Sequence, residues 1–154
     1  MLIIYHCYGG THSSVTAASL HLNKLPDDPK VKDLLALSLF DKIRAAAWGR
    51  LFYHGSDEFG NQIYSLGRGK HFNLIEAFFE SLKTACNLNG LLDEIVFIDT
   101  FPCVNIKMRI GGFLSRYLGV VSLGRNLSAI GTLEALPKLR KAVFEAKSKY
   151  SRKK

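Results

Sequence analysis

The first 22 residues combine an apolar run, a glycine pair and a segment with helical spacing. Residues 2–7 are largely apolar with little alternation, which is typical of a strand buried on both faces of a parallel sheet. Gly9-Gly10 breaks this strand, and Thr11 or Ser13 can cap a helix over Ser14–Leu22. A strand that enters a helix through a glycine turn is typical of layered α/β folds, so this segment restricts the fold class most strongly.

The rest of the chain continues the alternation of strand and helix patterns. A weaker helical pattern covers residues 30–48. The β-prone runs Arg50–His54 and Gln62–Leu66 then flank a loop rich in Gly, Asp and Asn, which predicts a hairpin with a long connection. The later patterns predict a helix over Asn73–Asn89, a buried strand over Glu94–Thr100, a helix over Val104–Leu118, a short strand over Val120–Leu123 and an amphipathic helix over Glu134–Tyr150.

These elements predict one α/β domain over residues 1–146, with a mostly parallel central sheet flanked by helices and an inserted β-hairpin around residues 50–66. Residues 147–154 are expected to form a frayed basic tail. In open α/β sheets, binding sites form at the carboxyl ends of the strands. We therefore expect the loop after the first strand, the residues after Asp99 and the loop after Val120–Leu123 to meet.

The composition favours a cytoplasmic protein. Of the 154 residues, 47% are hydrophobic, which is enough for a core, and no apolar run reaches the roughly 20 residues that span a bilayer. The N-terminus has no basic region before an apolar stretch, so it does not resemble a signal peptide. The cysteines are odd in number and widely spaced, unlike a disulfide framework, and this favours reduced thiols at Cys7, Cys86 and Cys103.

The net charge of +8 is concentrated at the C-terminus. Residues 138–154 hold eight Lys or Arg and one Glu, a net charge of +7, whereas residues 1–137 hold 13 basic and 12 acidic residues. Cations at the end of a helix complement its dipole and keep a chain soluble. The same charges could contact a nucleic acid or an anionic membrane surface, so a polyanion partner for the tail stays open.

The loop after the first strand has the composition of a phosphate cradle. A glycine turn that enters a helix presents free backbone N–H groups and the positive end of the helix dipole. The Walker pattern Gly-x-x-x-x-Gly-Lys-Ser/Thr is not met, because alignment on Ser13 places His12 at the lysine. The loop therefore predicts a degenerate P-loop-like site for a phosphate-bearing small molecule or a nucleotide with magnesium. A tight turn with a serine cap is the alternative. The expected cradle consists of Gly9, Gly10, Thr11, Ser13 and Ser14.

Charged residues elsewhere supply partners for such an anion. Asp99 ends an apolar strand, as does the acid that holds magnesium through water in nucleotide-binding domains, although a cap for the following turn is equally consistent. Arg109 and Arg116 are seven residues apart and share a face if their segment is helical, and Arg125 follows the next predicted strand. These arginines would clamp a phosphate through bidentate contacts, or else form a solvated face with ordinary ion pairs.

A second interpretation is thiol chemistry. Cys7 lies directly before the glycine turn, between His6 and His12, and a thiol near a helix N-terminus and imidazoles can become nucleophilic near neutral pH. Cys103 follows Asp99 by four residues and could lie near Cys7, for redox exchange or for a metal site with a histidine. The spacing from Cys7 to His12 lacks the paired pattern of zinc modules, so no metal ligand is assigned. The candidate catalytic residues are Cys7, His12 and Asp99.

The loop after Arg50–His54 has polar residues that could belong to a turn or to a flap. His54 and Asp57 flank it, and a loop of this composition is usually a turn, although a flap over the site is a minor alternative. His21, Trp48 and Cys86 are most simply packing or helix-surface residues.

Three runs together resemble a known family. They are Tyr-His-Cys-Tyr-Gly-Gly-Thr-His-Ser-Ser at 5–14, Gly-Ser-Asp-Glu-Phe-Gly-Asn-Gln-Ile-Tyr-Ser-Leu-Gly at 55–67 and Met-Arg-Ile-Gly-Gly-Phe-Leu-Ser-Arg at 108–116. The chain resembles domain of unknown function 3189, a group of small uncharacterised proteins from Firmicutes, over nearly its whole length. The resemblance implies a bacterial, cytoplasmic protein and carries no established activity, so it assigns no catalytic residue.

The residues therefore favour a domain that binds a phosphate-bearing small molecule or a nucleotide, with or without catalysis. The first alternative is a cysteine-dependent enzyme that uses Cys7 with His6 or His12 as base. The second is a regulatory or interaction protein whose basic tail binds a polyanion.

Overall fold

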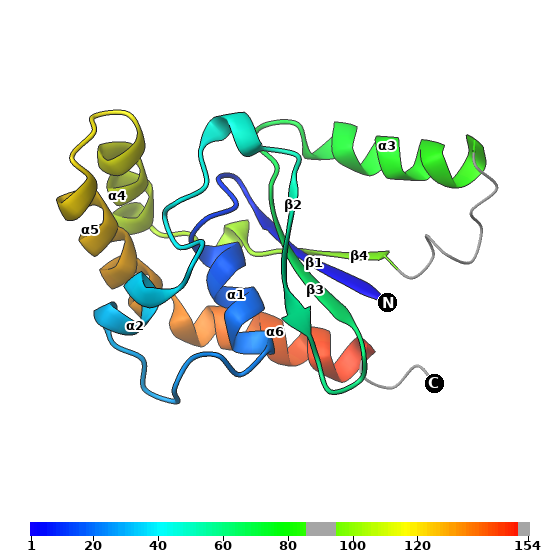
Figure 1. Cartoon of the computed structure of the whole chain (residues 1–154), viewed down its shortest axis with the longest axis horizontal. Coiled ribbons are helices and arrows are strands. Elements are labelled where there is room, and N and C mark those ends of the chain that lie inside the picture. The colour runs from blue at the N-terminus through cyan, green and yellow to red at the C-terminus, as the bar shows by residue number, and fades with distance from the viewer. Residues whose placement is uncertain (86–94, 151–154) are drawn as a thin grey trace.

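A four-stranded sheet lies at the centre of the structure, a computed structural model that describes residues 1–85 and 95–150 (Figure 1). The strands are ordered β2-β3-β1-β4; β1 runs parallel to β3 and β4, and β2 runs antiparallel to β3. The prediction of an α/β domain with a mostly parallel sheet is confirmed. The strands are β1 (Leu2–Cys7), β2 (Leu51–Ser56), β3 (Gln62–Gly67) and β4 (Ile95–Asp99).

Helices surround this sheet and follow most of the predicted segments. The weak pattern over residues 30–48 contains a short α-helix and a 3₁₀ turn. The predicted ends at Asn89 and Glu94, like Cys86, lie outside the described residues. The elements are α1 (Ser13–His21), α2 (Val31–Ala36), η1 (Ala45–Ala47), α3 (Phe72–Ala85), η3 (Phe101–Cys103), α4 (Ile106–Arg116), α5 (Val121–Glu134) and α6 (Leu136–Tyr150).

Alternation along β1 directs its side chains to the two faces of the sheet. Tyr5 lies in the core that α1 and α6 cover, with its hydroxyl 2.7 Å from His21 Nδ1. His6 lies on the opposite face, where its ring stacks on Phe72 of α3 at 4.2 Å between centroids and meets Phe97 edge-on. Both faces of β1 are buried, which explains its lack of alternation in the sequence.

The helices α4 and α5 pack closely against each other (Figure 1). A Cβ atom at Gly111 would lie 2.6 Å from Gly124 O, and one at Gly124 would lie 2.5 Å from Ser115 N, so only glycine permits this approach. The prediction of a short strand over Val120–Leu123 is wrong, because Val121 begins α5. Four apolar residues suit a strand or a helix equally, and the packing against α4 decides between them.

The loop between β2 and β3 lies at the far end of the sheet from Cys7, because β1 and β3 are parallel and β3 starts after this loop. Asp57 Oδ2 lies 3.1 Å from His21 Nε2 and also accepts a hydrogen bond from the Asn61 side chain. A buried chain of contacts thus runs from Asp57 through His21 to Tyr5. This arrangement anchors the loop to α1 and excludes a flap over the carboxyl end of β1.

The basic C-terminal segment continues α6 for part of its length. Residues 147–150 are helical, and residues 151–154 lie outside the described part of the chain. Lys147 lies 3.2 Å from Glu58, so one of the basic residues has an acidic neighbour. Binding of a nucleic acid or another polyanion by this segment stays a prediction. Within residues 1–85 and 95–150, no helix has both the length and the apolar character needed to cross a membrane.

Candidate functional site

The glycine turn after β1 lies directly against β3. Gly10 has φ +68°, and a Cβ atom there would lie 2.3 Å from Gly67 N, so this position requires glycine for both its conformation and its space. Main-chain hydrogen bonds from Arg68 to Cys7 O (3.0 Å) and from Gly69 to Tyr8 O (2.9 Å) fix the two segments together. The turn is therefore held by backbone contacts rather than by side chains that would need to move.

The turn leads into the N-terminus of α1 and leaves several backbone donors free. The first main-chain bond of this helix runs from Thr16 N to His12 O at 2.9 Å. Within the described residues, the N–H groups of Thr11, His12, Ser13 and Ser14 donate no hydrogen bond. Free donors at a helix N-terminus, together with the helix dipole, favour an anion at this position.

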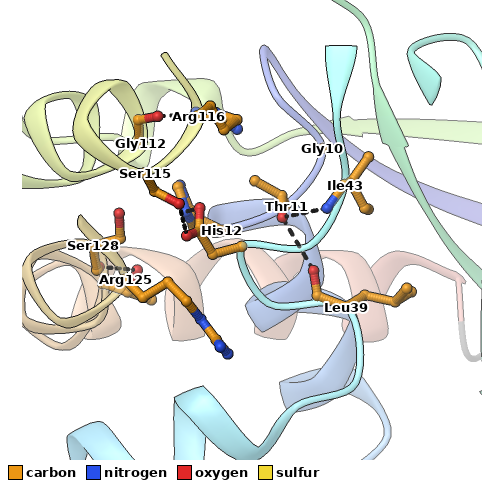
Figure 2. Close-up of polar contacts among 12 residues, drawn as sticks. Gly10, Thr11, His12, Leu39, Ile43, Gly112, Ser115, Arg116, Arg125 and Ser128 are labelled. Atoms are coloured by element: carbon orange, nitrogen blue, oxygen red, sulfur yellow. Dashed lines mark hydrogen bonds and ion pairs between the residues drawn. The ribbon is translucent and has the colours of Figure 1, made fainter. Parts of the chain in front are cut away.

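The hydroxyl groups of the turn serve different purposes. Thr11 Oγ1 donates to Leu39 O (3.1 Å) and accepts from Ile43 N (3.3 Å), so it fixes the segment after α2 and is not free for a ligand (Figure 2). The hydroxyl of Thr100 lies within hydrogen-bonding distance of Ser13 Oγ (3.1 Å) and of the main chain of β1. Thr100 therefore joins the end of β4 to the predicted cradle, which the sequence did not reveal.

Asp99 is directed away from the turn. It is paired with His6 across the strands, and its carboxylate lies 3.6 Å from His6 Nδ1 and 3.4 Å from Arg68. It also accepts from Phe101 N at 2.8 Å, as a cap for the following turn does. The structure thus places the Asp99 side chain on the face of the sheet that α3 covers, together with His6. The next residue, Thr100, contacts the predicted cradle instead.

The guanidinium of Arg116 lies directly beside the turn. It occupies space that glycine leaves open on two elements: a Cβ atom at Gly9 would lie 2.6 Å from Nη1, and one at Gly112 would lie 2.3 Å from Nη2. Its Nε donates to Gly112 O at 3.1 Å (Figure 2). Within the described residues, no carboxylate forms an ion pair with this guanidinium. Arg116 therefore lies beside the cradle with donors to spare.

A cavity of about 380 Å³ brings several predicted residues together. Arg109 and Arg116 both line it, so their expected common face is confirmed. Arg125 does not line it; because residues 120–123 form no strand, Arg125 lies on α5 beside a neighbouring cavity and donates to Leu35 O at 3.3 Å. We call the cavity of about 380 Å³ the loop cavity. It is lined by residues from β1, the turn and α4, which include Cys7, Gly9, His12, Ser13, Arg109 and Arg116.

His12 is held by a carboxylate from a distant part of the chain. His12 Nε2 lies 2.8 Å from Asp41 Oδ1, and the Ser115 hydroxyl donates to Asp41 Oδ2. Burial lowers the pKa of His12, so its ring is neutral at pH 7. Burial alone would raise the pKa of Asp41, but the hydrogen bonds from His12 and Ser115 outweigh this and lower it.

These protonation states fix the histidine tautomer. A carboxylate only accepts, so Nε2 carries the proton and donates to Asp41, which leaves a lone pair on Nδ1. A neutral imidazole oriented by a carboxylate in a cavity wall is suited to accept a proton from a ligand or a water molecule. Neither Asp41 nor Ser115 was predicted from the sequence as a partner of His12. Asp41 follows His12 by 29 residues and Ser115 follows it by 103, so no local pattern relates them to it.

The thiol of Cys7 points into the turn. Gly10 N–H donates to Cys7 Sγ at 3.1 Å, and Ser14 Oγ lies 3.4 Å from the sulfur. His6 follows the strand alternation to the opposite face, which removes it as a base for this thiol. Burial raises the pKa of Cys103, the other cysteine that the structure describes. Among residues 1–85 and 95–150, no three His, Cys, Asp or Glu side chains are grouped to hold a metal ion.

The family model described as "Protein of unknown function (DUF3189)" matches residues 2–148, nearly the whole chain. The chain belongs to the DUF3189 family. No curated protein and no solved structure matches it. The matched range of this DUF3189 protein contains the glycine turn, both arginines of the loop cavity and the carboxylate that holds His12.

Proposed function

We propose that this DUF3189 protein binds a phosphate-bearing small molecule, such as a nucleotide, at the N-terminus of α1. One observation carries the proposal: the guanidinium of Arg116 lies beside Gly9, at a cavity that the start of α1 also lines, and no carboxylate of the described residues lies at salt-bridge distance from it. An unpaired arginine beside free main-chain donors at a helix N-terminus forms a strong anion site.

The remaining residues of the cavity support the same ligand. Arg109 adds a second cation to the wall, and Ser13 adds a hydroxyl at the first position of α1. His12 stands where a Walker lysine would reach the outer phosphates, and its neutral ring cannot replace that charge. Arg116 supplies the cation from α4 instead. The protein thus binds the phosphate by a turn and an arginine from another element, rather than by one contiguous motif.

Arg116→Gln is expected to remove the increase in melting temperature that phosphate compounds produce in the wild-type protein. Loss of a charge-assisted, bidentate contact costs roughly 1.5–3 kcal/mol, or about a tenfold to hundredfold loss of affinity. The measurement is a thermal shift with inorganic phosphate, AMP and ATP, followed by calorimetric titration of the strongest ligand. Arg140→Gln makes the same charge change on α6, where Arg140 donates to Asp27 O outside both cavities, and should leave the shift intact. A wild-type protein that no phosphate compound stabilises would overturn the proposal.

A second candidate function is catalysis by Cys7 at the same site. The specific observation is that Gly10 N–H and Ser14 Oγ both approach Sγ, which is how a protein solvates an anionic sulfur. On a phosphate ester, Sγ attacks phosphorus and forms an S–P bond while the P–O bond to the alcohol breaks. The departing alkoxide takes a proton from water, and the hydroxide left behind cleaves the S–P bond, which releases inorganic phosphate and restores the thiolate.

Iodoacetamide at pH 7 is expected to alkylate Cys7 faster than Cys103, because Gly10 N–H and Ser14 Oγ approach the first sulfur, whereas burial raises the pKa of the second thiol. Peptide mass spectrometry over time gives both rates in one sample, so Cys103 is an internal control. Ser14→Ala should slow the reaction of Cys7 alone. Equal rates for the two thiols would eliminate this candidate function without affecting the binding proposal.

A further inference from the structure

A second cavity, of about 590 Å³, adjoins the loop cavity. Tyr8, Arg116 and Tyr117 line both, so Arg116 stands at the boundary between them. The second cavity is bounded by the segment that follows Asp41, by the end of α4 and by the beginning of α5. One ligand that extends past Arg116 can therefore occupy both spaces.

The wall of the second cavity is strongly basic. Lys42, Arg44 and Arg125 line it together with Arg116. Within the described residues, none of these four side chains is paired with a carboxylate at salt-bridge distance, and the buried Nε of Arg125 has no hydrogen-bond partner. Four cations without acidic partners around one cavity favour an anionic occupant.

The single acid in this wall, Asp41, interacts electrostatically with Arg116 but forms no ion pair at salt-bridge distance with any of the four cations. The Asp41 side chain is fully buried, and its two oxygens already accept from His12 and from Ser115. Its φ of +55° shows that the backbone adopts an uncommon conformation to place the carboxylate there. Asp41 thus faces the protein interior, whereas the exposed Lys42 and Arg44 that follow it carry the charge of the cavity wall.

Tyr8 and Trp48 are the aromatic residues of the second cavity that pack against each other. Tyr8 meets Trp48 edge-to-face with ring centroids 5.1 Å apart. The indole also covers two glycines: Cβ atoms at Gly67 and Gly69 would lie 2.9 Å and 2.7 Å from it. Aromatic rings and basic side chains around one cavity suit a ligand with a sugar or ring body and anionic groups.

We infer that the second cavity is a second anion subsite, and that the ligand of this protein is a small molecule with two separated phosphate groups, bound on either side of Arg116. The first phosphate lies at the N-terminus of α1, so this half of the inference rests on the proposed function. The second phosphate lies between Lys42 and Arg44, with Tyr8 and Trp48 against the body of the ligand. The chemistry is shared by sugar bisphosphates and by nucleosides phosphorylated at both ends of the ribose.

The test compares matched pairs of ligands by calorimetric titration at fixed ionic strength. The pairs are fructose 6-phosphate with fructose 1,6-bisphosphate and AMP with adenosine 3′,5′-bisphosphate. In at least one pair the bisphosphate should bind about tenfold or more tightly than the monophosphate. The pair with the larger ratio identifies the body of the ligand as a sugar or a nucleoside. Equal affinities within both pairs would overturn the inference.

A double variant separates this inference from the proposed function. Lys42→Gln with Arg44→Gln changes two exposed side chains that have no hydrogen bond or ion pair with the described residues. It should lower bisphosphate affinity about tenfold and leave affinity for the monophosphate and inorganic phosphate unchanged. Arg116→Gln should weaken all of them. Unchanged bisphosphate binding in the double variant overturns the second subsite alone, whereas wild-type protein that binds no phosphate compound overturns the proposed function.

Discussion

Gly10→Ala is expected to destabilise the protein by about 2–5 kcal/mol and to abolish the proposed phosphate binding. A residue with a side chain in the left-handed region costs about 1–2 kcal/mol. Contact of the new Cβ with the main chain of Gly67, 2.3 Å from its nitrogen, adds the cost of overpacking, typically 1–3 kcal/mol. Backbone atoms of a central strand cannot move aside, so the turn itself must shift. Urea unfolding and the thermal shift with phosphate measure the two effects.

Gly60→Ala is the matched control for this substitution. Gly60 has φ +78°, close to the +68° of Gly10, but a Cβ atom there would meet nothing within 4 Å. It should cost only the conformational penalty, about 1 kcal/mol, and should leave ligand binding intact. If the two variants unfold with the same free energy, the contact between the turn and β3 is not what holds the cradle.

Acidification from pH 7 to pH 5 is expected to remove a large part of the stability, with a slope above 1.4 kcal/mol per pH unit, the value for one proton. Burial lowers the pKa of four histidines, with values of about 4 for His6 and His54 and lowered values for His12 and His21. The unfolded chain binds protons near pH 6.5, while the folded protein resists them until lower pH. The stability is therefore complete above about pH 6.5 and declines as the pH falls towards 4. Urea titrations at half-unit steps give the slope.

His54→Gln tests the origin of this slope. Burial is the main cause of the lowered pKa of His54, and Lys24 adds to it. Glutamine keeps a donor for Ser65 Oγ, which lies 2.8 Å from His54 Nε2, and removes one titrating group. The slope below pH 6.5 should fall by about one proton. Ser65→Ala, by contrast, should lower stability at every pH and keep the slope. An unchanged slope in His54→Gln would show that the acid sensitivity arises elsewhere.

The first strand, its turn and α1 could be predicted from the sequence because their determinants are local. The apolar run, the glycine pair and the following helical spacing lie within 22 residues, and the structure starts α1 at Ser13, one residue before the predicted start. The common face of Arg109 and Arg116 followed from helical periodicity in the same way. These features depend on neighbours in the sequence and not on the packing of distant elements.

The other features of the fold and of the candidate site depend on contacts between residues that are far apart in the chain. Whether residues 120–123 form a strand or a helix is decided by glycine contacts between α4 and α5. Asp41 reaches His12 from a segment that Thr11 fixes through hydrogen bonds to Leu39 and to Asp41 itself. The Asp99 side chain lies away from the predicted cradle because Asp99 is paired with His6 across the strands, and the sequence pattern does not show this register. The position of the candidate site thus follows from local sequence patterns, whereas the residues that the fold brings around it could be predicted only in part.

The end of the sheet opposite the two cavities can carry an attached label. The loop between β2 and β3, anchored through Asp57 and His21, projects from the end opposite both cavities, and Phe59 and Gly60 at its tip are exposed. A fluorophore or a biotin attached at this tip would leave the entrance to each cavity unobstructed. Immobilised in one known orientation, the protein could be screened against phosphate compounds on a sensor surface without the label competing with the ligand.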